Sequence, residues 1–159
     1  LQPLRSSDKI QIMKIYLDVC CLNRPFDDQT QDRIHLEAEA ILSILNHSRT
    51  AGWSVIGSDA IDFEISKIPD DDKRLMVRIL STMHDAHIKV DAGVEKRARE
   101  IMSLGLKTLD ALHLACAEKA KATVFLTTDD NLLSRSFKNK RALKVKVDNP
   151  QRWVMEVLK

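Results

Sequence analysis

The sequence predicts an α/β fold, a three-layer α/β/α sandwich around a parallel sheet of about five strands. Short apolar runs alternate with longer segments in which apolar residues recur every three or four positions. Strands and helices that alternate in this way are joined by crossover connections, which give a parallel sheet with helices on both faces. The 159 residues are enough for one domain with a core of ordinary size.

Five segments have strand character, because each is a short apolar run next to polar or turn-forming residues. They are residues 13–17, 53–57, 87–90, 124–126 and 144–147. The segment from Asp18 to Asp28 is expected to be a loop, since it contains Asn23, Pro25 and Asp27.

Helices are expected between the strands. Residues 31–48 carry an apolar stripe from Ile34 to Leu45, and Ser58 and Thr108 have the character of N-caps. The other expected helices are 60–68, 69–83, 92–102, 109–120 and 132–137, with a last helical turn in 149–159.

Composition excludes several classes. No apolar run approaches the roughly 20 residues that span a bilayer, and no secretory leader is recognisable. Three cysteines form neither a disulfide framework nor a zinc-spaced set, so a reducing cytoplasm is expected. Residues 1–12 are polar and weakly patterned, and are interpreted as an N-terminal extension (a cloning remnant or a start set too far upstream), which leaves residues 13–159 as the domain.

Four acidic residues stand where expected strands end or expected helices begin: Asp18, Glu64, Asp110 and Asp129. The carboxyl ends of strands are where α/β sheets place their ligands. Asp110 lies in an otherwise apolar helix, where a buried carboxylate needs a partner. Carboxylates gathered at one edge indicate a hard divalent cation, Mg²⁺ or Mn²⁺. The leading interpretation is therefore a metal-dependent phosphodiester hydrolase.

Two positions stay open on the residues alone. Asp62 rivals Glu64 on the same expected helix, and Asp130 rivals Asp129, because spacing does not decide which side chain faces the metal. His113, three residues after Asp110, is expected to be a buried, hydrogen-bonded histidine rather than a general base.

The motifs resemble, in order, those of the PIN-domain nucleases, in particular VapC-like ribonuclease toxins. An Asp follows the first strand in Ile15-Tyr16-Leu17-Asp18, and Ser58 is followed six residues later by Glu64. An acid opens an apolar helix in Leu109-Asp110-Ala111-Leu112, and a strand ends in Thr127-Thr128-Asp129. The resemblance runs from Met13 to about Val147. One departure is Cys20, at a position where many relatives carry a small polar residue.

The resemblance implies a PIN-like fold and an Mg²⁺- or Mn²⁺-dependent endoribonuclease. It favours Glu64 over Asp62 and Asp129 over Asp130. The implied catalytic and metal-binding set is Asp18, Glu64, Asp110 and Asp129, with one or two ions and with Thr127 and Asn23 in support. It also implies the toxin of a type II toxin–antitoxin pair, with an antitoxin protein as partner and a homodimer as assembly. A catalytically degenerate PIN fold that binds RNA or protein is the alternative.

An RNA substrate requires basic side chains at the rim of an acidic pocket. Between Asn131 and Val147 the chain carries six Lys or Arg and no acid. The unranked candidates for RNA contact are Arg24, Arg135, Lys138, Lys140 and Arg141.

Overall fold

A single parallel sheet organises the molecule. The computed structural model describes residues 13–158. Its strands are β1 (Lys14–Leu17), β2 (Ser54–Ser58), β3 (Ala86–Ile88), β4 (Val124–Leu126) and β5 (Lys146–Asp148). Every neighbouring pair is parallel, in the order β3-β2-β1-β4-β5. The predicted α/β class with about five parallel strands is confirmed. The predicted extension at residues 1–12 lies outside the described residues.

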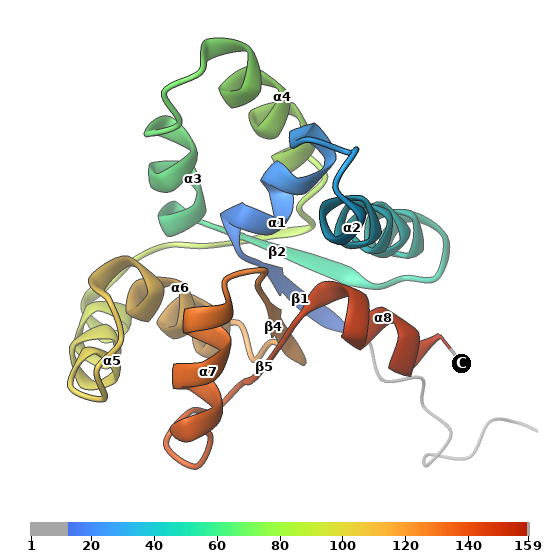
Figure 1. The fold of residues 1–159 in the computed structure, drawn as a ribbon. Helices are drawn as coiled ribbons and strands as arrows, with labels where there is room; N and C mark the ends of the chain where they lie inside the picture. Colours follow the sequence, from blue (N-terminus) through green and yellow to red (C-terminus); the bar gives the residue numbers. More distant parts are fainter. Residues whose placement is uncertain (1–12, 159) are drawn as a thin grey trace, which may run out of the picture.

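Helices cover both faces of this sheet, which gives three layers (Figure 1). They are α1 (Val19–Asn23), the 3₁₀ helix η2 (Arg24–Phe26), α2 (Asp32–Thr50), α3 (Asp59–Ser66), α4 (Asp71–Ser81), α5 (Ala92–Met102), α6 (Thr108–Lys119), α7 (Asp130–Lys138) and α8 (Pro150–Val157). Helices α2 and α8 pack together on one side, and α5, α6 and α7 lie on the other. Within residues 13–158, no helix has the length and apolar character needed to cross a membrane.

The two central strands, β1 and β4, form the middle of the core. Residues 15–17 and 124–126 are all fully buried, as expected for parallel strands covered on both faces. Tyr16 pairs with Phe125 in the strand register, and their rings stack with centroids 5.2 Å apart. The ends of β1 and β4 are therefore held rigidly beside each other.

The predicted loop from Asp18 to Asp28 is wrong over most of its length, since residues 19–26 form α1 and η2. Asp18 caps α1 by accepting a hydrogen bond from the Val19 N–H at 2.8 Å. Helix α1 then buries Val19, Cys21 and Leu22 in the core. This burial, which depends on the rest of the fold, outweighs the local preference for a turn.

Helix starts follow the expected chemistry at most positions. Ser58 caps α3, since its Oγ accepts from the Ile61 N–H at 3.0 Å. The predicted cap at Thr108 is wrong: Lys107 is the N-cap of α6 and Thr108 is the first helical residue. The backbone carbonyl of Lys107 already accepts from the Ala111 N–H at 2.9 Å, so the helix starts one residue earlier than predicted.

Gly57 in β2 provides a test of packing beside the sheet. A Cβ at this position would lie 2.8 Å from His84 Nδ1 and 3.1 Å from its Cβ and Cγ. Gly57→Ala is therefore expected to lower the free energy of unfolding by about 1–3 kcal/mol in urea titrations. Gly93→Ala in α5 is the control, because its Cβ would meet only Asp91 Oδ1, at 3.4 Å. Equal stability of the two variants would contradict the clash.

Candidate metal centre

The topology places a switch point at the carboxyl end of β1. The chain runs from β1 to β2 and β3 on one side, and returns to β4 and β5 on the other. Ligands of open α/β sheets bind where the strand order reverses in this way. Asp18 follows β1, and residues 127–129 follow β4. The Asp18 N–H donates to the Leu126 carbonyl at 2.9 Å, which holds the two segments side by side.

Asp18 lies buried at this switch point, with 5% of its surface exposed. One carboxylate oxygen caps α1, and the other accepts from the Thr127 hydroxyl at 2.8 Å and from the Cys20 thiol at 3.4 Å. Burial raises the pKa of Asp18, and the charge of Glu64 adds to that rise, while His113 opposes it. A carboxylate in such surroundings is stabilised by a nearby cation.

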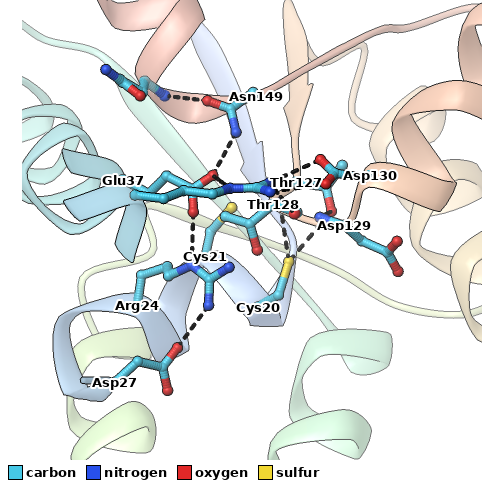
Figure 2. A network of polar contacts seen from close by, with 12 residues as sticks. Cys20, Cys21, Arg24, Asp27, Glu37, Thr127, Thr128, Asp129, Asp130 and Asn149 are labelled. Atoms are coloured by element: carbon cyan, nitrogen blue, oxygen red, sulfur yellow. Dashed lines mark hydrogen bonds and ion pairs between the residues drawn. The ribbon is translucent and has the colours of Figure 1, made fainter. Parts of the chain in front are cut away.

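Cys20 and Thr127 link the two strand ends. The Cys20 Sγ lies 3.3 Å from Thr127 Oγ1 and accepts from the Thr128 N–H at 3.3 Å. Thr127 Oγ1 accepts from the Asp129 N–H at 3.1 Å. Thr127 therefore touches both Asp18 and the backbone of Asp129. Figure 2 shows Cys20, Thr127 and Asp129 close together. Cys20 therefore lies at the site, beside Asp18 and Thr127, and also packs against the core.

Glu64 extends from α3 toward Asp18 and is held there by His113 of α6. The His113 Nε2 lies 3.1 Å from Glu64 Oε1. Because a carboxylate only accepts, Nε2 carries a proton and donates it. Asp18, Glu64 and His113 each place a ligand atom within 4.8 Å of the other two. Asp62 instead lies with Asp59 and His87 on the exposed side of α3.

A buried hydrogen-bonded chain orients His113. The Tyr16 hydroxyl lies 2.7 Å from both His113 Nδ1 and Ser58 Oγ. Burial lowers the pKa of His113, but the hydrogen bond to Glu64 and the charge of Asp18 outweigh it and leave the pKa raised. His113 is fully buried and hydrogen-bonded on both nitrogens, as predicted. Sequence reasoning missed Tyr16, although a tyrosine inside an apolar strand signals a buried partner for its hydroxyl.

Asp110 and Asp129 complete the acidic centre. Asp110 is half-buried in the first turn of α6, and its pKa is raised to about 6 by burial and then by the charges of Asp18 and Asp129. Asp129 caps α7 with Oδ1, which accepts from two backbone N–H groups at 2.9 and 3.2 Å. Asp130 is exposed and pairs with Arg33, which lowers its pKa. Of the two adjacent acids, Asp129 is therefore the one whose charge acts on Asp110.

The donor set fits a hard divalent cation. Asp18 and Glu64 place ligand atoms within 4.8 Å of each other, in a group with His113. Asp110 is near enough to Asp18 and Asp129 for repulsion between their like charges to add to the effect of burial on its pKa. A divalent ion would offset that repulsion, and its preferred ligands are carboxylate oxygens. The site therefore suits Mg²⁺ or Mn²⁺ rather than a metal that prefers sulfur or several imidazoles.

The other predicted site residues are placed differently. Asn23 ends α1, and within residues 13–158 its buried Oδ1 has no hydrogen-bond partner. Arg24 is engaged by Glu37 at 2.9 Å and Asp27 at 3.0 Å, and Arg135 donates to the Gly105 carbonyl. Three of the predicted basic residues are exposed at or just beyond the C-terminal end of α7 and make no ion pair with the described residues: Lys138, Lys140 and Arg141.

Comparison with known families agrees with this geometry. The PIN domain family matches residues 15–138, a stretch that contains all four acids. The chain belongs to the PIN domain family. This membership confirms the predicted resemblance and implies a nuclease, a hydrolase of phosphodiester bonds, as the general class of activity.

A solved structure has the same PIN fold. It is VapBC2 from Rickettsia felis, bound to a DNA fragment from their promoter. The TM-score is 0.54 at 14% sequence identity, and the match covers 86% of this chain and 98% of the other. At this identity the likeness supports the fold. Comparison with curated proteins gives no match.

Proposed function

We propose that this PIN domain is an Mg²⁺- or Mn²⁺-dependent endoribonuclease and the toxin of a type II toxin–antitoxin pair. The observation that carries the proposal is the environment of Asp110, whose pKa is raised to about 6 by burial and then by the charges of Asp18 and Asp129. A half-buried carboxylate close to two other carboxylates at a sheet switch point is costly unless a cation joins them. Perturbed carboxylates in a crevice are also a feature of catalytic sites.

Each side chain has a distinct task in this mechanism. Asp18, Asp110 and Asp129 would hold one or two ions, and Glu64 would hold a water or a second ion. A bound divalent ion lowers the pKa of a water and shields negative charge on the scissile phosphate. Thr127 fixes one oxygen of Asp18 by its hydrogen bond at 2.8 Å, and His113 fixes Glu64 at 3.1 Å.

The RNA would meet positive charge at the far end of α7. This helix begins beside Asp129 and ends at Lys138, a length of about 13 Å at 1.5 Å per residue. Lys138, Lys140 and Arg141 are exposed there and would offset phosphate charge along a strand that enters the acidic centre. Arg24 and Arg135 are weaker candidates, since hydrogen bonds within the fold already engage their guanidinium groups.

The toxin role rests on the PIN fold shared with VapBC2 and on an exposed apolar surface. Phe63 on α3 and Leu75, Met76 and Ile79 on α4 are each about half exposed or more. Exposed apolar side chains on two helices that pack together are candidates for protein contacts. An antitoxin protein and a homodimer are therefore proposed as partners.

Metal-dependent cleavage of labelled single-stranded RNA tests the activity. Wild-type protein is expected to cleave with Mg²⁺ or Mn²⁺ and to stop in EDTA. Asp18→Asn is expected to lose cleavage, because Asn keeps the cap of α1 but offers no anionic oxygen. Asp91→Asn is the matched control: Asp91 caps α5 through the Val94 N–H at 2.9 Å.

The outcomes separate the two candidate functions. Equal rates of RNA cleavage by wild type and Asp18→Asn would contradict the metal mechanism. RNA binding by the wild type without cleavage in either metal would favour the degenerate binding module. Growth arrest on expression that disappears in Asp18→Asn would support the toxin role.

A further inference from the structure

We propose that Arg33 of α2 is a positioning residue for the metal centre, which clamps the turn at residues 128–130 and thereby sets the direction of the Asp129 carboxylate. The proposal rests on the proposed metal centre and names the device that orders one of its ligands. Asp129 needs such a device, because it is exposed and lies on a turn between a strand and a helix.

The clamp contacts the residues on both sides of Asp129, the side chain of Asp130 and the backbone of Thr128. Arg33 Nη1 and Nη2 donate to the two carboxylate oxygens of Asp130, each at 2.8 Å. Nη2 also donates to the Thr128 carbonyl at 3.0 Å. A planar guanidinium that bonds a carboxylate in a fork fixes direction as well as distance. The residues before and after Asp129 are therefore held by one side chain from another helix.

The clamp is itself anchored to a buried acid. Arg33 Nε donates to Glu37 Oε2 at 3.3 Å, and Glu37 is only 1% exposed. Glu37 also accepts from Arg24 at 2.9 Å and from Asn149 at 2.6 Å. Figure 2 shows Glu37 between these two partners, with Thr128, Asp129 and Asp130 close by. Because η2, α2 and the N-cap of α8 all contribute, the anchor is part of the rigid fold.

The same contacts keep the neighbouring acid away from the metal centre. Asp130 is occupied by the Arg33 guanidinium, whereas Asp129 hydrogen-bonds only to backbone N–H groups through Oδ1 among the described residues. Without Arg33, Asp129 and Asp130 would compete for one cation, and the turn that carries them would lose its fixed geometry. Arg33 therefore selects Asp129 as the ligand.

Arg33→Met tests the clamp against a closely matched control, Arg97→Met. Arg97 also donates to a buried acid (Glu118), an exposed acid (Glu100) and a backbone carbonyl (Ala142), but it lies on α5 away from the acidic centre. Titration calorimetry with Mn²⁺ is expected to show about 10–100-fold weaker binding in Arg33→Met and unchanged binding in Arg97→Met. In cleavage assays, Arg33→Met is expected to have a lower kcat and an unchanged KM. Arg33→Lys, which keeps the charge without the fork, is expected to recover only part of the affinity.

Amide hydrogen exchange of the metal-free proteins gives a readout that needs neither ion nor activity. In Arg33→Met, the Asp129, Asn131 and Leu132 amides are expected to exchange faster, while those of α5 keep their rates. Unchanged exchange at these amides in folded Arg33→Met would overturn the clamp. Wild-type protein that binds no Mn²⁺ would overturn the proposed metal centre instead, and the exchange comparison would still decide whether Arg33 holds the turn.

Discussion

Glu37→Ala is expected to lower the free energy of unfolding by about 3–5 kcal/mol, the effect of removing one partner from a buried ion pair. Glu37 is 1% exposed and accepts hydrogen bonds from Arg24, Arg33 and Asn149. Its loss removes one of the two carboxylates that pair with the Arg24 guanidinium, which is only 20% exposed, and leaves Asp27 as the other. The Tm is expected to fall by roughly 6–20 °C, since 1 kcal/mol corresponds to about 2–4 °C in a chain of this size.

Glu39→Ala is the control for this variant. Glu39 lies two residues away on the same helix and is exposed, so its replacement is expected to change stability by no more than about 0.5 kcal/mol. Glu37→Gln keeps the shape of the side chain and loses its charge. Its free energy of unfolding is expected to lie between those of Glu37→Ala and Glu39→Ala. If Glu37→Ala unfolded at the same urea concentration as Glu39→Ala, the buried acid would not be holding the helices together.

The elements predicted well are those whose signals are local. Helix α5 has the predicted bounds of residues 92–102, and β4 those of residues 124–126, because caps and apolar runs are written in adjacent residues. Helix α1 was missed because Asn23 and Pro25 favour a turn locally, while burial of Val19, Cys21 and Leu22 depends on the rest of the fold. Propensity gives way to tertiary packing at such positions.

The acidic centre was partly predictable for the same reason. Asp18 and Asp129 follow strands, so the sequence alone puts them at one edge of a parallel sheet. Glu64 needed the orientation of α3, which places Asp62 on the exposed side with His87. Their catalytic roles remain predictions.

The supporting network had no local signal at all. The partners of Arg33 and Glu37 in α7 and just before α8 are 97 and 112 residues away. In the sequence of α2, Arg33 and Glu37 look like ordinary charged residues of a helix surface. Only the packed fold reveals that Glu37 is buried and that Arg33 reaches the turn beside Asp129.

Asp110→Asn is expected to abolish metal-dependent cleavage and at the same time to stabilise the metal-free protein at neutral pH. The pKa of Asp110 is raised from its usual 3.8 to about 6, first by burial and then by Asp18 and Asp129. A carboxyl with a raised folded-state pKa favours folding most at low pH, and that contribution is lost as the pH rises through about 6. At pH 7.5 the charged Asp110 therefore destabilises the metal-free fold.

The expected size follows from the same pKa. At about 1.4 kcal/mol per pKa unit, the difference corresponds to about 3 kcal/mol, and solvent screening of a half-exposed group reduces it to about 1–2 kcal/mol. Urea unfolding in EDTA is expected to show Asp110→Asn more stable than wild type by this amount at pH 7.5, with little difference near pH 4. Asp72→Asn, an exposed acid in the first turn of α4, is the control and is expected to show no such gain.

Added metal is expected to reverse the order of stability. An ion that binds only the folded wild type adds about 2.7 kcal/mol at 100 times its Kd, whereas Asp110→Asn lacks an anionic ligand and gains little. Removing a ligand that supplies several kcal/mol of transition-state stabilisation corresponds to a loss of cleavage of about 1,000-fold or more. A stability difference that does not depend on pH, or an equal gain of both proteins from Mn²⁺, would mean that Asp110 is an ordinary helix-terminus carboxylate. The reversal would instead show that its repulsion from Asp18 and Asp129 is tolerated in the fold because a cation offsets it.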